Sequence, residues 1–431
     1  MKSRLINVLA YGTALAITRV IIIVLSPLLV MWVNEVELAR WSVSISLSSM
    51  FAAVLGMGLS TAAVRWYYDA LPEGRAQMLG MFLSLRLISF VGIGLFVAVV
   101  SALAWKPLTG GTLPILPYLP MLIVFGIGES IARFLASVLR LHNQPLKLLL
   151  LRLMHALGAG GVVSLTTVVS DIEPFVSFSI AYLLLALPMF FVMVRYVDRP
   201  ETFFPAEVVP ILRFSLPLTL HDLGWWFRGM SLTLVVANFE EGATLSAFFL
   251  SMLVLMPFGV LFAGIDQTLA ADYYRDRSQG KTPTNARKNY RIAIFASSII
   301  ASGCMLLTAP VAHAFFVAQA DIIITVCPIV LFGAVFHGAY VVWVKPLIYL
   351  KKSGLLLFGT ATISITGVSL AAFLGPSYGY IAVAWLSAGM FAGTALFALL
   401  AVYFLKDEPL DLFGPISSLS LSGLTLAFVL L

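Results

Sequence analysis

Long apolar runs follow one another along the whole chain, and this repetition restricts it to few folds. Each run has roughly twenty apolar residues, enough to cross about 30 Å of hydrocarbon as a helix that rises about 1.5 Å per residue. Hydrophobic residues make up 61% of the chain and charged residues only 11%, which excludes a soluble globular protein. The sequence predicts about twelve membrane spans and a weaker thirteenth, at 5–33, 38–64, 77–104, 114–140, 146–170, 174–195, 211–238, 243–270, 289–318, 321–350, 353–375, 378–405 and 412–431.

These spans are expected to be α-helices. A membrane β-strand needs alternating polarity over about ten residues, whereas these runs are continuous and rich in Leu, Ala, Ile and Phe. The connections are short, roughly twenty residues at most, so a soluble catalytic domain has no room to fold. We therefore expect an all-α polytopic membrane protein that is not an enzyme. Its two cysteines, Cys304 and Cys327, fall within predicted spans and are interpreted as small core residues.

Positive charge alternates between the two sides of the predicted spans. Lys and Arg gather at the amino end, in 65–86, 133–152, 195–213, 275–291 and 345–352, and at Lys406. The intervening connections hold only Arg40 and Lys106, so the positive-inside rule predicts a cytoplasmic amino terminus. Two basic residues, Arg19 and Arg228, remain inside the membrane. The net charge of +6 is therefore interpreted as a topology signal, and no nucleic-acid partner is expected.

The two halves of the chain resemble each other. "GLSTAAVRWYYDALPEGR" at 58–75 aligns with "GIDQTLAADYYRDRSQGK" at 264–281, and a similar offset places Arg19 on Arg228. Repeats with an even number of helices share one orientation in the membrane. We expect two six-helix lobes that face each other across a central cleft. The predicted boundaries are 1–200 for the N-terminal lobe, 201–405 for the C-terminal lobe and 406–431 for a turn with a possible thirteenth helix.

The two intramembrane arginines are the main candidates for a substrate site. Arg19 follows Arg4 at the same spacing as Arg228 follows Arg213, so both are expected about 22 Å along their helices. A charge at this depth is costly, and the planar guanidinium suits phosphate. We interpret Arg19 and Arg228 as facing each other across the cleft and holding an anion. The alternative is that each forms a structural pair with a carboxylate, from Asp222, Asp266 or Glu129.

His221 and Trp225 share a helical stripe with Arg228 and are further candidates for substrate binding. The imidazole has two open interpretations, a buried hydrogen bond or a proton-coupling role. The indole ring either packs against neighbouring helices or stacks on a sugar. His337 is expected near a span end or polar turn, without a chemical role.

Three carboxylates are candidates for binding a coupling ion, Na⁺ or H⁺: Asp222, Asp266 and Glu129. Asp222 is the strongest candidate, because it lies deep in a predicted span beside Arg228. Asp266 lies close to a predicted cytoplasmic boundary and is expected to reach interfacial water. Glu129 precedes Arg133 by one helical turn, a spacing that favours a local salt bridge over ion binding.

The chain resembles polysaccharide flippases of the Wzx type, within the MOP superfamily that also contains MATE transporters and lipid II flippases. The resemblance is carried by "LGMGLSTAAVRWYYD" (55–69), "LRFSLPLTL" (212–220) and the repeat of six helices. It implies a two-lobed transporter of the bacterial cytoplasmic (inner) membrane that moves an undecaprenyl-pyrophosphate-linked oligosaccharide by alternating access. Arg19 and Arg228 match the cationic residues that receive the pyrophosphate in such a transporter.

The expected partners are therefore the lipid-linked oligosaccharide, membrane lipids and a polysaccharide polymerase or glycosyltransferase complex. The main alternative is a MATE-type, cation-coupled exporter of drugs or small molecules. Acidic residues would be expected to dominate the cleft of such an exporter, whereas acids and arginines nearly balance here. A membrane-embedded glycosyltransferase is disfavoured, because it needs a sizeable loop with acidic or metal-binding residues.

Overall fold

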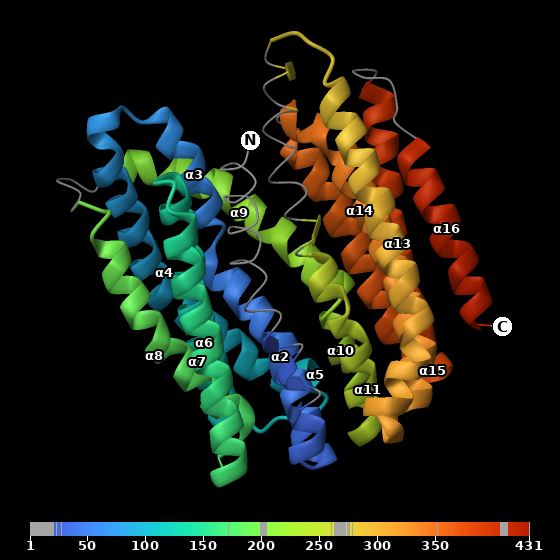
Figure 1. Ribbon diagram of the computed structural model, residues 1–431. Helices are drawn as coiled ribbons and strands as arrows, with labels where there is room; N and C mark the ends of the chain where they lie inside the picture. Colours follow the sequence, from blue (N-terminus) through green and yellow to red (C-terminus); the bar gives the residue numbers. More distant parts are fainter. Residues whose placement is uncertain are drawn as a thin grey trace. The chain divides into compact units, whose positions relative to one another are not determined.

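The fold is all helical in the part of the chain that the structure describes (Figure 1). The computed structural model describes residues 28–170, 172–198, 205–259, 279–350, 352–405 and 413–430, with 21, 22, 24–26, 261, 262, 273, 276 and 277. Nine helices within these ranges are long and apolar enough to cross a membrane. The chain forms two compact units, unit 1 (Met1–Trp226) and unit 2 (Phe227–Leu431).

Unit 1 contains most of the predicted N-terminal spans as helices. Its elements are α2 (Glu35–Gly56), α3 (Leu59–Asp69), α4 (Arg75–Leu103), the short α5 (Trp105–Thr109), α6 (Ile115–Leu141), α7 (Pro145–Val169), α8 (Pro174–Val194) and most of α9 (Pro205–Arg228). Asn34 begins α2 by accepting a hydrogen bond from the Glu37 backbone N–H at 2.9 Å. Proline occupies the first turn of α7 and α8, where no backbone donor is needed.

The second predicted span is broken into α2 and α3. Met57 and Gly58 both take left-handed backbone conformations, with φ of 48° and 62°, and end one helix before the next begins. A Cβ atom on Gly58 would lie 2.5 Å from the Ser215 carbonyl oxygen of α9. Only glycine therefore allows this close approach, and the continuous span predicted for 38–64 is corrected to two helices.

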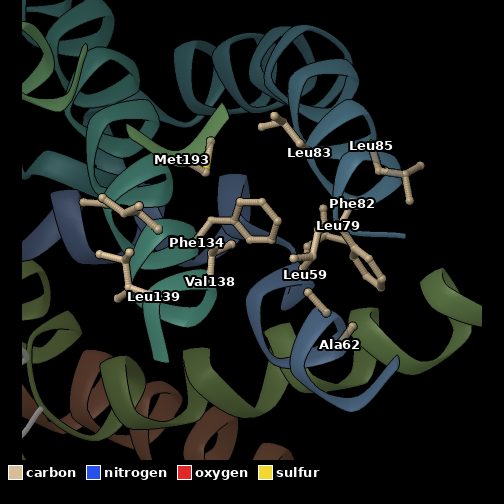
Figure 2. Packing of buried hydrophobic residues seen from close by; sticks show 14 of the residues in the cluster. Leu59, Ala62, Leu79, Phe82, Leu83, Leu85, Phe134, Val138, Leu139 and Met193 are labelled. Carbon is tan, nitrogen blue, oxygen red and sulfur yellow. The ribbon is translucent and has the colours of Figure 1, made fainter. Parts of the chain in front are cut away.

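A hydrophobic cluster holds α3, α4, α6 and α8 together (Figure 2). Phe134 and Val138 of α6 lie between Leu59 of α3 and Met193 of α8, and Phe82 of α4 is fully buried in the same cluster. Full burial of a side chain of this size contributes about 1.5–3 kcal/mol relative to exposure to water. The cluster fixes the helices that carry the buried charges of unit 1.

Unit 2 consists of a second set of apolar helices. They are α10 (Ser231–Val236), α11 (Gly242–Leu253), α13 (Thr284–Phe315), α14 (Ala320–Tyr349), α15 (Ser353–Leu405) and α16 (Phe413–Leu430). Helix α16 lies beside α13 and α14, so the weak thirteenth span predicted at 412–431 is a helix that packs within unit 2 (Figure 1).

Helix α15 is interrupted at Gly379, where φ is 73° and ψ is −177°. A Cβ atom on Gly359 would lie 2.2 Å from the Phe397 ring, and one on Gly367 would lie 2.2 Å from Met390. These pairs show that the halves before and after Gly379 run antiparallel in close contact. The interruption confirms the two separate spans predicted at 353–375 and 378–405.

Candidate functional site

Arg228 lies at a break between two helices. Helix α9 ends at Arg228 and α10 begins at Ser231, so the continuous span predicted for 211–238 is interrupted there. The Arg228 side chain is only 2% exposed. Its backbone carbonyl accepts a 2.6 Å hydrogen bond from Ser387 Oγ of α15. Carbonyls in the last turn of a helix lack their usual intrahelical partners, and Ser387 provides one here.

The Arg228 guanidinium lies close to two aromatic rings. Its Cζ atom lies 5.5 Å from the Phe391 ring centroid and 5.9 Å from that of Tyr340, within the range of a cation–π interaction. Its Nε and Nη1 atoms are buried and have no hydrogen-bond partner in the described part of the chain. Among the described residues, no carboxylate forms a salt bridge with it.

This arrangement suits an external anion. A buried charge that lacks a partner costs several kcal/mol, and the rings offset only part of that cost. The N–H groups of Nε and Nη1 remain as donors for charge-assisted hydrogen bonds. A phosphate or carboxylate with several acceptor oxygens would satisfy both the charge and the donors.

His337 belongs to the same aromatic cluster, which corrects its expected place near a span end. It lies in the interior of α14 and stacks on Tyr340, with ring centroids 5.7 Å apart and an interplanar angle of 20°. Its ring also meets Phe391 edge to face at 6.0 Å. Three rings from α14 and α15 thus lie around or next to the guanidinium.

Unit 1 contains a buried arginine that sequence reasoning assigned to a cytoplasmic connection. Arg86 lies inside α4 and is fully buried. Its Nη1 atom donates to the Ser130 carbonyl at 2.6 Å and to Ser130 Oγ at 2.5 Å, and Nη2 donates to Ser60 Oγ at 3.0 Å. Its Cζ atom lies 4.7 Å from the Phe134 ring centroid. Arg86 therefore connects α3, α4 and α6 through neutral acceptors.

Glu129 of α6 is the centre of an ionic network in unit 1. Its Oε1 atom accepts from Arg133 Nε at 2.7 Å, which confirms the predicted salt bridge. Its Oε2 atom accepts from Arg152 Nη1 at 3.3 Å and from the Tyr182 hydroxyl at 2.5 Å. His155 lies beside this network, with Nε2 2.8 Å from the Tyr182 carbonyl.

Sequence reasoning missed Arg152 and Tyr182, which lie on other helices, and placed both Arg133 and Arg152 in a connection. Only the spacing of Glu129 and Arg133 carried a local signal. With two arginines and a tyrosine hydroxyl around it, Glu129 is held as the anionic member of an ion-pair network. Its role in ion coupling stays a prediction.

The other predicted site residues are only partly described. Arg19 and Asp266 and the side chain of Asp222 lie outside the described residues, so their proposed roles stay predictions. His221 and Trp225 are partly buried in unit 1, whereas Arg228 belongs to unit 2. The neighbouring Trp226, which the sequence offered either for packing or for stacking on a sugar, is buried, and its Nε1 atom donates to the Ser46 carbonyl of α2 at 2.7 Å.

The cysteines form no disulfide, and only one of them is a core residue. Cys327 is buried in α14 and accepts a hydrogen bond from Thr308 Oγ1 at 3.7 Å. Cys304 is exposed on α13, which corrects its expected burial. Within the described residues, no three His, Cys, Asp or Glu side chains are grouped to hold a metal.

No family model matches the chain, and no curated protein sequence matches it. Solved structures do match it over nearly the whole length. The lipid II flippase MurJ, in an inward closed conformation, aligns with a TM-score of 0.70 and 16% identity over 97% of each chain. An inward-facing multidrug resistance MATE transporter of the MOP superfamily aligns with a TM-score of 0.64 and 17% identity, over 96% of this chain and 95% of that one.

A MOP superfamily transporter from Pyrococcus furiosus, described by the reverse polarity of its binding pocket, aligns with a TM-score of 0.64 and 18% identity over 96% of each chain. Identities at this level show a shared fold. The chain is thus an all-α, multi-pass membrane protein with the fold shared by MurJ and the MATE transporters of the MOP superfamily.

Proposed function

We propose that this protein is a transporter that moves a lipid-linked oligosaccharide across the bacterial cytoplasmic membrane, and that Arg228 binds the pyrophosphate of the lipid carrier. The observation that carries the proposal is the buried Arg228 guanidinium, whose Nε and Nη1 atoms have no acceptor in the described part of the chain. A pyrophosphate supplies negative charge and several acceptor oxygens, the chemistry that this guanidinium needs.

The broken helix supports this assignment. Transporters commonly place their substrate sites where a membrane helix is interrupted. At such an interruption the ends of the two half-helices expose backbone polar groups deep in the bilayer. Arg228 is the last residue of α9, and α10 begins three residues later at Ser231. Arg19 is proposed as the second anion contact, since the sequence repeat places it on Arg228.

The remaining assignments follow from the sequence and stay proposals. His221 and Trp225 are further candidates for substrate contacts, and Asp222, Asp266 and Glu129 for the coupling of transport to Na⁺ or H⁺. The amino terminus is proposed to be cytoplasmic. A polysaccharide polymerase or glycosyltransferase complex is proposed as the partner that supplies or consumes the oligosaccharide.

A MATE-type exporter is the second candidate function, because MATE transporters share the fold over nearly the entire chain. A cationic drug would need a carboxylate in the binding site. In the described part of the chain, Glu129 has two arginine partners, and Arg228 offers positive charge instead. The local charge therefore favours an anionic substrate.

The test is movement of a fluorescent undecaprenyl-pyrophosphate sugar in proteoliposomes. Loss of hydrogen bonds to a charged group costs about 1.5–3 kcal/mol, so Arg228→Ala is expected to slow movement about 10- to 100-fold. Arg228→Lys retains the charge but lacks the planar set of N–H donors of the guanidinium, and it is expected to be partly active.

Arg40→Ala is the matched control, because it removes an arginine whose salt bridge with Glu173 is partly exposed. It is expected to leave movement of the lipid unchanged. Normal movement by Arg228→Ala would refute the assignment of Arg228 as the pyrophosphate contact. Export of a cationic dye without movement of the lipid by the unaltered protein would refute the flippase assignment and favour the exporter.

A further inference from the structure

Two residues of α15 hold Arg228 from two sides. Ser387 Oγ donates to the Arg228 backbone carbonyl at 2.6 Å, and the Phe391 ring centroid lies 5.5 Å from its guanidinium carbon. Ser387 and Phe391 are one helical turn apart and therefore share a face of α15. One residue of this pair contacts the main chain at the helix end, and the other contacts the side chain.

The contact with Phe391 uses none of the hydrogen-bond donors of Arg228. An aromatic face attracts a cation through its π-electrons and requires no N–H group of the guanidinium. An amide, hydroxyl or carboxylate at the same place would accept hydrogen bonds and compete with an incoming anion. Nε and Nη1 indeed have no hydrogen-bond partner among the described residues. The ring thus stabilises the cation while its donors stay available.

The supporting face of α15 is closely packed. A Cβ atom on Gly333 of α14 would lie 2.9 Å from Cα of Ala388, the residue that follows Ser387. The two helices approach each other at backbone distance here, and the same α14 carries Tyr340, the second ring beside Arg228. Close packing of this kind restricts the movement of the Ser387 and Phe391 side chains.

We propose that Ser387 and Phe391 are positioning residues that hold Arg228 ready for an anion, with Phe391 stabilising the guanidinium without using its hydrogen-bond donors. The inference rests on the proposed function of Arg228 as the pyrophosphate contact. On this proposal, the aromatic contact contributes to specificity for the anion. A planar guanidinium beside a ring presents its N–H groups in a fixed direction, and a lysine ammonium at residue 228 does not reproduce that.

The test is binding of inorganic pyrophosphate to the purified full-length protein, measured by titration calorimetry alongside the melting temperature. Phe391→Leu removes the ring at similar volume and is expected to weaken binding about tenfold. Phe391→Tyr retains the ring and is expected to restore affinity. Ser387→Ala is expected to weaken binding about threefold to tenfold, and Ser387→Thr, which keeps a hydroxyl, to restore it.

Matched controls separate positioning from loss of stability. Phe397→Leu removes another ring of α15, one that packs against Gly359. Thr394→Ala removes another buried hydroxyl of α15, one that donates to the Phe391 carbonyl. Both controls are expected to bind pyrophosphate as the unaltered protein does. If Phe391→Leu does not fold, Ser387→Ala with its threonine rescue decides the question alone.

The outcomes distinguish the two proposals. If Arg228→Ala weakens pyrophosphate binding while Ser387→Ala and Phe391→Leu bind like their controls, the positioning role is wrong and the anion site stands. If Arg228→Ala binds pyrophosphate normally, the proposed function itself fails. In the Arg228→Ala background, Phe391→Leu is expected to have no further effect on binding, and an undiminished effect there contradicts positioning through Arg228.

Discussion

Arg86 in unit 1 and Arg228 in unit 2 are both buried, yet their surroundings differ. Arg86 donates three hydrogen bonds to Ser130 and Ser60 and lies over Phe134. Arg228 lies close to the rings of Tyr340 and Phe391, and its Nε and Nη1 atoms have no partner among the described residues. Burial alone therefore does not identify a ligand-binding arginine. Nε lacks a partner among the described residues in both arginines, so the difference lies in Nη1, which Arg86 uses to bind Ser130 and which has no acceptor in Arg228.

The ionic network of unit 1 is expected to be the most sensitive structural element. Glu129→Gln removes the negative charge that Arg133 and Arg152 share and leaves Arg152, which is buried, without a carboxylate partner within the described residues. Breaking a buried ion pair by removing one partner costs about 3–5 kcal/mol. Urea or thermal unfolding in detergent measures this loss. Unchanged stability would show that the network is not structural and would favour an ion-coupling role for Glu129.

Replacement of Arg86 tests the structural side of the comparison. Arg86→Met retains much of the side-chain length but leaves the Ser130 and Ser60 hydroxyls without their donor. A loss of about 2–4 kcal/mol in unfolding free energy is expected, from unsatisfied buried groups and altered packing. The melting temperatures of this variant and of the original protein measure the loss. A stable Arg86→Met protein that no longer binds pyrophosphate would reverse the assignment and make Arg86 a ligand contact.

Replacement of Arg228 by methionine is expected to raise the stability of the protein, whereas Arg86→Met lowers it. Arg228→Met removes a buried charge that, among the described residues, has neither a hydrogen-bond acceptor for Nε and Nη1 nor a carboxylate partner. Substitution of buried charges by apolar residues stabilises some proteins by about 1–4 kcal/mol. We expect a higher melting temperature together with lost transport, the usual exchange of stability for function at a site. A strongly destabilised Arg228→Met protein would indicate a counter-ion such as Asp222.

The smallest effect is expected from a single Arg86 contact. Ser60→Ala removes the hydroxyl that accepts from Arg86 Nη2 at 3.0 Å but leaves both bonds to Ser130. The loss of one hydrogen bond to a charged group costs about 1.5–3 kcal/mol when the donor stays unsatisfied, and less if water reaches it. Unfolding in detergent measures the difference, with Ser84→Ala as the control, because the part-buried Ser84 hydroxyl donates within its own helix α4. Equal stability of the two variants would mean that Ser60 does not restrain Arg86.

Most helices were predictable because their length depends on local composition. The apolar run at 114–140 became α6 at Ile115–Leu141, and the run at 146–170 became α7 at Pro145–Val169. The thickness of the hydrocarbon layer sets this length, and hydropathy alone reports it. The breaks at Gly58 and Arg228 were missed, because both lie within apolar runs and depend on helices distant in the sequence.

The charged sites show the same difference: contacts within one helix were predictable from the sequence, and contacts between distant helices were not. The Glu129–Arg133 bond was predicted because both residues lie one turn apart on a single helix. Arg86 was assigned to a connection because it follows Arg65 and Arg75 closely, and its burial depends on Ser130, which lies 44 residues away. The ring cluster around Arg228 required contacts among α9, α14 and α15 that no local pattern indicates.

Thermal unfolding of the purified protein with and without inorganic pyrophosphate tests most directly whether Arg228 is prepared for an anion. A ligand that binds only the folded state raises the melting temperature as its concentration exceeds the Kd. The original protein and Arg40→Gln are expected to show this rise, and Arg228→Met is expected to show none. An equal rise in Arg228→Met would contradict the assignment of Arg228 as the anion contact.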